Sequence, residues 1–149
     1  MLHRLAELDA LVRDNYQHFD FRKIYQTLFN FMTVDLSAFY FDIRKDTLYC
    51  DADSSLERRA CRTVMDIAFH CLTRWLAPVL SFTTEEVWQS RFGVSDDSVH
   101  LQQFFEIAAD WQDNELAAKW DNIRKVRRVV TGALEVERRD KRIGSSLEA

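Results

Sequence analysis

Only three glycines and one proline interrupt the 149 residues of this chain. Average usage would make about 12% of a chain of these two residue types. β-Sandwiches, barrels and nucleotide-binding sheets need turn residues about every ten positions. Phosphate-binding loops need clustered glycines, whereas helical bundles need few turn residues of either type. The scarcity therefore predicts an all-α protein and argues against a glycine-rich loop that would hold a nucleotide phosphate.

Apolar residues recur every three or four positions in five segments, which predicts a bundle of about five helices. The predicted helices span residues 2–16, 21–43, 55–77, 83–91 and 114–142. The second helix has more apolar surface than a single stripe, so we expect it near the centre of the bundle with neighbours on two sides. All five helices fit one domain over residues 1–149.

Polar and helix-breaking residues mark the ends of these helices. Asp20 and a serine at position 54 or 55 are suited to cap the second and third helices. Pro78 is expected to end the third helix, and Gly93 the fourth. Thr83 and Glu86 have the spacing of a capping box, which predicts that the fourth helix begins there.

Two stretches lack a clear helical period. Residues 46–55 hold three aspartates around a short apolar patch and are predicted to be extended. Residues 99–105 are apolar but fit neither helix nor strand. Whether these two stretches pair as a small sheet stays open.

The net charge of −4 is unevenly distributed along the chain. Residues 1–118 carry eleven Lys and Arg against nineteen Asp and Glu, whereas residues 119–142 carry nine against four. A nucleic-acid-binding domain is typically strongly basic. Only the C-terminal end therefore has the sign of charge that attracts phosphates.

The last predicted helix places five basic side chains within one face, where they would follow a row of phosphates. These residues, called here the basic ribbon, are Arg124, Lys125, Arg128, Arg139 and Arg142. Asp121 and Glu135 precede Lys125 and Arg139 by four residues on that face, where ordinary ion pairs form. The residues alone favour a solvated face over a phosphate-binding one.

No metal site, disulfide or membrane span is predicted. The four histidines are scattered, and the three cysteines are odd in number without a C-x-x-C spacing, which favours reduced thiols in the cytoplasm. No apolar run approaches the roughly 20 residues of a membrane span. Trp75, Trp88 and Trp120 lie at core spacing and are interpreted as packing residues.

Longer strings are more specific than this periodicity. In chain order they are HRLAELD over 3–9, IYQTLFNFMTVDLSAFYFDIRKDTLYC over 24–50, RWLAPVLSFTTEEVW over 74–88, SVHLQQFF over 98–105, and an ending of ALE followed by KRIGSSLEA. They resemble the helical region that follows the catalytic core in isoleucyl-tRNA synthetases, which are class I aminoacyl-tRNA synthetases. The resemblance covers nearly the whole chain, and the string DLSAFYFDIRKDTLY favours the isoleucine enzymes over their valine and leucine counterparts.

This chain departs from the family pattern in two ways. Ser81 and Phe105 stand where the family usually has proline, which affects only local turn geometry. The H-x-G-H and K-M-S-K-S signatures, which bind and activate ATP in this family, have no match. The resemblance therefore implies an anticodon-binding domain without adenylation or editing sites, inactive alone and without a cofactor. ATP and Mg²⁺ would serve the catalytic domain of the parent enzyme, and residues 143–149 would lead toward a missing C-terminal module.

The leading hypothesis is a domain that holds the anticodon arm of isoleucine tRNA while the catalytic domain of the same parent chain carries out ATP-dependent ligation. We expect a monomer in which the basic ribbon contacts tRNA phosphates, with Arg44 and Lys45 as secondary candidates. The alternative is a helical protein-interaction or scaffold domain without nucleic-acid binding. The acidic residues 1–118 and the possible ion pairs within the ribbon favour that alternative.

Overall fold

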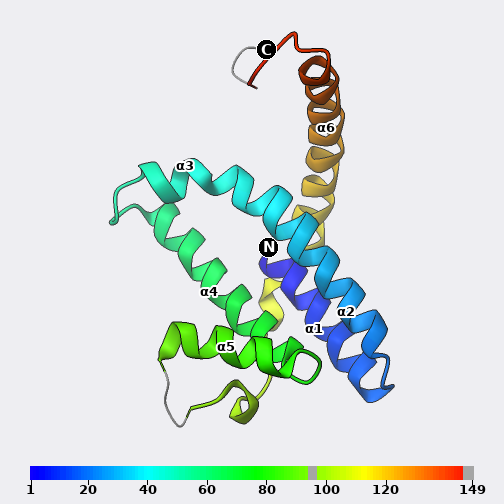
Figure 1. Ribbon diagram of the computed structural model, residues 1–149, viewed down its shortest axis with the longest axis vertical. Coiled ribbons are helices and arrows are strands. Elements are labelled where there is room, and N and C mark those ends of the chain that lie inside the picture. Colours follow the sequence, from blue (N-terminus) through cyan, green and yellow to red (C-terminus); the bar gives the residue numbers. More distant parts are fainter. Residues whose placement is uncertain (94–96, 146–149) are drawn as a thin grey trace. The chain divides into compact units, whose positions relative to one another are not determined.

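The computed structural model describes residues 1–93 and 97–145, and the chain divides into two compact units, Met1–Gln112 and Asp113–Ala149. Within the described residues the chain is helical and contains no strand, which confirms the predicted all-α helical bundle (Figure 1). The prediction of one domain over residues 1–149 stays a prediction. In the part that the structure describes, no helix is both long enough and apolar enough to cross a membrane.

The first unit contains five α-helices, one π-helical stretch and two short 3-10 turns among its described residues. They are α1 (Leu2–Gln17), α2 (Phe21–Asn30), η1 (Phe31–Phe41), α3 (Asp42–Cys50), α4 (Leu56–Leu76), α5 (Ser81–Phe92), η2 (Val99–Leu101) and η3 (Ala109–Trp111). The second unit contains α6 (Asn114–Arg139).

The helix predicted over residues 21–43 continues to Cys50 through α2, the π-helical η1 and α3. The prediction of an extended stretch over residues 46–55 is therefore wrong for its first half. Leu48 packs against the hydrophobic core, so the last helical turn has an apolar side chain to bury. The chain becomes extended only at Asp51, whose ψ is 150°.

Three of the predicted helix ends are confirmed. Asp20 caps α2 by accepting a hydrogen bond from the Lys23 amide at 3.0 Å, and Ser55 caps α4 by accepting one from the Arg58 amide at 3.3 Å. Gly93 ends α5 with a φ of +83°, a conformation that residues with a Cβ rarely adopt.

The predicted capping box at Thr83 and Glu86 is wrong, because α5 already begins at Ser81. The Leu80 carbonyl accepts hydrogen bonds from the Thr84 amide at 2.9 Å and from the Thr84 hydroxyl at 3.0 Å. Thr83 therefore lies inside the first turn of the helix, where it cannot act as the cap.

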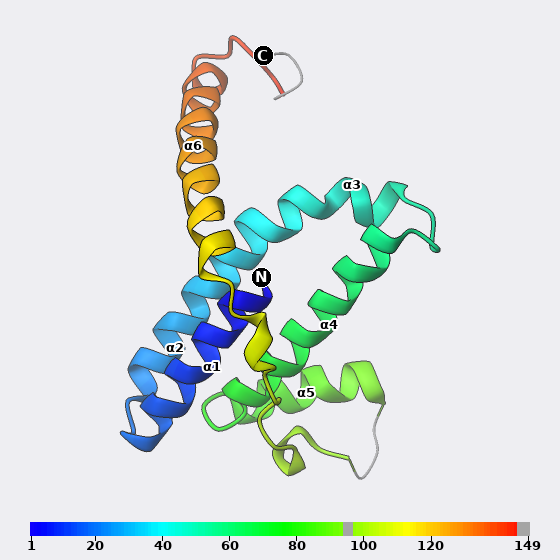
Figure 2. The same cartoon turned by 180° about the vertical axis from the view of Figure 1, so that it is seen from behind.

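Helix α1 lies between α2 and α4, as both views of the molecule show (Figure 1 and Figure 2). Its buried side chains join those of its two neighbours in one core, whose most deeply buried members include Leu5, Leu8, Val12, Ile24, Leu28, Phe31, Cys71 and Trp75. The Tyr16 hydroxyl donates a hydrogen bond to the Trp75 carbonyl at 2.6 Å, and burial raises the pKa of Tyr16 to about 12.

The helix predicted over residues 21–43 was expected to have neighbours on two sides, and it is only partly covered. Its buried residues belong to the core that α1 and α4 also form, whereas Tyr25, Phe29 and Val34 are exposed. Of the tryptophans predicted to pack, Trp75 and Trp88 are buried and Trp120 in α6 is 39% exposed.

A second group of packed rings joins α4 to α5 and to the segment that follows η2. His70 stacks on Phe92 and Phe105, with ring centroids 5.8 and 6.1 Å apart, and meets Trp88 edge-on at 5.7 Å. Burial, together with the nearby Arg74, lowers the pKa of His70. The Glu85 carboxylate accepts hydrogen bonds from the Ser98 hydroxyl and the Val99 amide. These bonds hold the start of η2 against α5.

Replacing Leu28 by Ala should reduce the free energy of unfolding by about 2–5 kcal/mol, because the side chain is fully buried and its removal leaves a cavity. Leu101 is 73% exposed, so the same replacement there should change stability by less than about 0.5 kcal/mol. Urea titrations followed by circular dichroism measure both. Equal losses in the two variants would contradict the assignment of the core.

The protein should lose stability as the pH falls below 6.5, because the lowered pKa of His70 means that the unfolded chain takes up that proton first. The His70→Phe variant keeps a flat ring in the cluster without a titrating group. Its free energy of unfolding should fall less between pH 7 and pH 5.5 than that of the wild type, in urea titrations at each pH. Parallel curves for the two proteins would refute the role given to His70.

Candidate nucleic-acid interface

Helix α6 presents most of the basic ribbon in regular helical register. It begins after Asp113, whose carboxylate accepts from the Leu116 amide at 2.8 Å, and it runs through Gly132 without a break. Helical geometry places the ribbon residues from 124 to 139 within an arc of about 100°. The helix ends at Arg139, three residues earlier than predicted, and Lys141 follows with a φ of +57°. Arg142 therefore lies beyond the helix and outside that register.

The ion pairs of the ribbon differ from the two expected from the sequence. Glu135 pairs with Arg138, while Arg139 Nε lies 3.7 Å from an Asp140 oxygen. Arg142 pairs with Glu137 at 3.1 Å. The C-terminal half of the ribbon is therefore largely neutralised by neighbouring carboxylates.

Two residues in the N-terminal half of the ribbon, Lys125 and Arg128, are less engaged. Lys125 Nζ lies 3.5 Å from the amide oxygen of Asn122, which is a weak contact. The Arg128 guanidinium has no ion pair or side-chain hydrogen bond among the residues that the structure describes. Arg128 is thus the ribbon residue best placed to receive an anion.

The secondary candidates Arg44 and Lys45 lie on α3 in the first unit. Lys45 Nζ pairs with Asp42 at 2.7 Å. Arg44 is half-buried beside Tyr40 and Cys61 at a small cavity of about 320 Å³, and its Nε has no hydrogen-bond partner within the described part of the chain. The ribbon belongs to the other unit.

Three further arginines lie over aromatic rings in cation–π contacts. Arg74 lies 5.5 Å from the ring of Trp88 and 5.8 Å from that of Phe105, and Arg91 lies 4.7 Å from the ring of Phe69. Arg13 lies 5.5 Å from the ring of Phe104. These cation–π contacts support the packing of the first unit.

The functional candidates that the sequence reasoning missed lie near the start of α4. Arg59 and Arg62 are exposed and, within residues 1–93 and 97–145, make no side-chain hydrogen bond or ion pair. The signal was visible, because Arg58, Arg59 and Arg62 have the three- and four-residue spacing that gathers side chains on one side of a helix.

The cysteines and acids show no sign of a reactive or metal-binding centre in the described residues. The three cysteines are free thiols, with Cys50 exposed and Cys61 and Cys71 buried. Burial raises the pKa of the Cys71 thiol to about 12, which makes it a poor nucleophile. Among the residues described, no three His, Cys, Asp or Glu side chains come together as a metal site would require.

Comparison with known proteins identifies close relatives along the whole chain. A family model described as the anticodon-binding domain of tRNA ligase matches residues 1–149. All 149 residues align with isoleucine–tRNA ligases of Agrobacterium fabrum, Brucella abortus (strain 2308) and Gluconobacter oxydans, at 66%, 60% and 56% identity. The chain spans 15% of the length of each of these relatives.

Proposed function

Because the chain belongs to the family of anticodon-binding domains of tRNA ligases, we propose that it binds the anticodon arm of isoleucine tRNA and positions that tRNA for ligation. The observation that carries the proposal is the match of all 149 residues to isoleucine–tRNA ligases at 56–66% identity. The helical fold supports it, because a rigid bundle holds an RNA arm in a fixed orientation. The bond-making step belongs to a catalytic module of a longer ligase chain.

This chain contributes binding energy and orientation, which accelerate a reaction at a distant site without chemistry of their own. ATP and Mg²⁺ would act in the catalytic module. The residues of this chain do not fit a nucleotide phosphate loop, because Gly93, Gly132 and Gly144 are far apart in the sequence. The cytoplasm is the proposed location, which the three free thiols support, and a monomer is the proposed state.

The basic ribbon supplies the proposed contacts to tRNA phosphates. Within its N-terminal half, Arg128 has no side-chain partner among the described residues, and Lys125 makes only a weak contact with Asn122. Arg139 and Arg142 would have to exchange Asp140 and Glu137 for phosphates. Arg44 and Lys45 remain secondary candidates.

The second candidate function is a helical protein-interaction domain without nucleic-acid binding. The exposed apolar side chains of α6 favour it, with Val126 at 65% and Val129 at 74% exposure. A filter-binding titration of the wild-type chain with isoleucine tRNA at low salt separates the two functions. The tRNA-binding function requires saturable binding that weakens as salt rises, and the alternative requires none.

Replacing both Arg124 and Arg128 by Glu should weaken tRNA binding at least about tenfold at low salt and make it less salt-dependent, because two phosphate contacts are lost. The measurement is the dissociation constant of the chain for isoleucine tRNA across a salt series. The slope of its logarithm against the logarithm of salt concentration should fall by roughly one to two.

The matched control is the Arg22→Glu, Lys23→Glu double variant, which changes the net charge by the same amount at exposed positions in the first turn of α2. It should bind tRNA more tightly than the ribbon variant does. If the two double variants weaken binding equally, only total charge matters and the ribbon makes no specific contact.

A further inference from the structure

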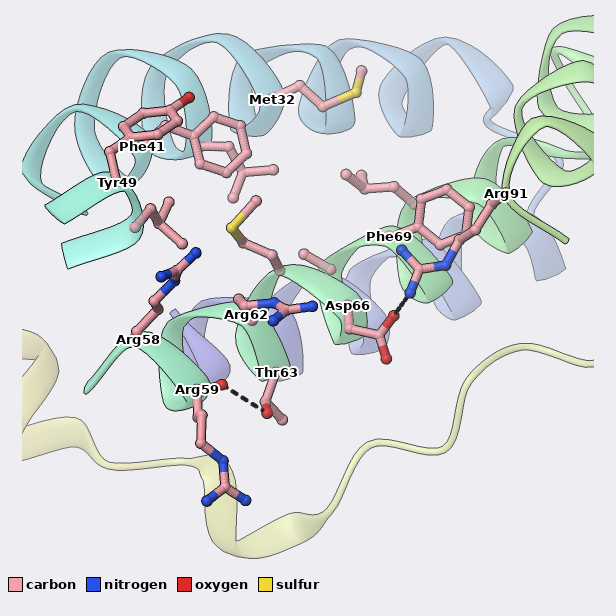
Figure 3. A pocket seen from close by; sticks show the side chains of 15 residues that line it. Met32, Phe41, Tyr49, Arg58, Arg59, Arg62, Thr63, Asp66, Phe69 and Arg91 are labelled. Atoms are coloured by element: carbon pink, nitrogen blue, oxygen red, sulfur yellow. Dashed lines mark hydrogen bonds and ion pairs between the residues drawn. The ribbon is translucent and has the colours of Figure 1, made fainter. Parts of the chain in front are cut away.

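A pocket of about 1060 Å³ lies within the first unit, bounded by η1, α3, α4 and one residue of α5 (Figure 3). Its inner wall is apolar, with Met32 and Leu36 from η1 facing Ala68 and Leu72 from α4. This volume is slightly above the roughly 300–1,000 Å³ of small-molecule sites and is far larger than a single phosphate needs. A ligand that fills it must have an apolar or aromatic part as well as any charge.

The charged residues that line the pocket are four arginines and one aspartate. Asp66 is already paired with Arg91, which closes one end of the pocket (Figure 3). Arg58 pairs with Asp53 at 2.7 Å and donates to the Asp51 carbonyl at 2.7 Å. The pocket therefore has an excess of positive charge after its internal pairs are formed.

That excess resides on Arg59 and Arg62. Neither guanidinium makes a hydrogen bond or ion pair with any residue in 1–93 or 97–145. Arg62 lies on α4 between Arg58 and Asp66, beside the apolar wall (Figure 3). An arginine in this position offers a planar fork of donors that matches the oxygens of a phosphate.

Two aromatic rings lie at the opposite end of the pocket from Arg91. Tyr49 at the end of α3 is 84% exposed, and Phe41 beside it is 38% exposed (Figure 3). The Tyr49 hydroxyl has no hydrogen-bond partner among the described residues. A large exposed ring in a pocket that also holds arginines without an ion pair is an arrangement on which proteins stack the bases of single-stranded nucleic acid.

We propose that this pocket binds an unstacked nucleotide of an RNA loop, with its phosphate on Arg62 and its base against Tyr49. The inference rests on the proposed tRNA-binding function and adds a specific site to it. A base-paired stem does not fit, because its bases are already stacked on one another and cannot reach an aromatic side chain. Arg59, on the same helix, is available to the phosphate of a neighbouring nucleotide.

The test uses this 149-residue chain and two RNA probes: a stem–loop with the sequence of the isoleucine tRNA anticodon arm, and a blunt duplex of the same stem. The variants are Arg62→Gln and Tyr49→Leu. Their matched controls are Arg22→Gln, an exposed arginine on α2 without a side-chain partner in the described residues, and Tyr25→Leu, a half-exposed tyrosine on the same helix. Circular dichroism and urea midpoints establish that all four variants fold.

Both pocket variants should bind the stem–loop at least about fivefold more weakly than their controls and bind the duplex as the controls do. A fluorescent adenine analogue in the loop should change emission on binding the wild type, and this change should be lost in Tyr49→Leu. If the wild type binds the stem–loop while the pocket variants match their controls, the pocket is not a nucleotide site and the proposed function stands. If the wild type binds neither the stem–loop nor whole tRNA, both proposals fall.

Discussion

The hydrogen bond from the Tyr16 hydroxyl to the Trp75 carbonyl connects α1 to the end of α4. The Trp75 carbonyl is open because α4 ends at Leu76, just before Pro78, so the Val79 amide that would serve Trp75 in a continuing helix does not reach it. Val79 and Leu80 both donate to Leu76, so the Trp75 carbonyl is available to another element. Tyr16 satisfies it from α1 while Trp75 itself is fully buried. The end of α4 thus leaves an acceptor for Tyr16, and this contact joins α1 to the C-terminal end of α4.

The pocket follows from this constraint. Helix α4 is held against α1 near its C-terminal end and against α3 near its N-terminal end. The continuous run of α2, η1 and α3 packs on α1 at one end and reaches α4 at the other (Figure 1). Between these two contacts the side chains of η1 and α4 face each other without filling the space, and the cavity of about 1060 Å³ remains.

Local signals in the sequence predicted most of the helices, because a helix end depends on a few neighbouring residues. Asp20, Ser55 and Gly93 act within one turn of their own positions and were found. The end of α3 was missed because the three aspartates of residues 46–55 suggested a loop, while the deciding contact of Leu48 with the core comes from residues distant in sequence. The capping box failed because an earlier residue, Ser81, already started the helix.

The site was less predictable than the fold, because the sequence shows a charge but not its partner. Arg62 and Arg74 lie on the same helix, yet Arg74 lies over Trp88 and Phe105 while Arg62 makes no ion pair with a described residue. The positive charge of the ribbon is clear from the sequence, but the sequence does not show that Arg139 and Arg142 lie against Asp140 and Glu137. Only the three-dimensional pairing separates charges that stabilise the protein from charges that remain for a ligand.

Phosphate contacts and base stacking are two different ways for a negatively charged chain to bind RNA. A chain with a net charge of −4 cannot rely on its overall field to attract RNA. Phosphate contacts along Arg124 and Arg128 act only locally, and they weaken as salt rises because the counterions released on binding enter a more concentrated solution. Stacking on Tyr49 depends on contact between flat surfaces and is less sensitive to salt. A phosphate contact cannot distinguish one nucleotide from another because every phosphate is alike, whereas a contact with a base can.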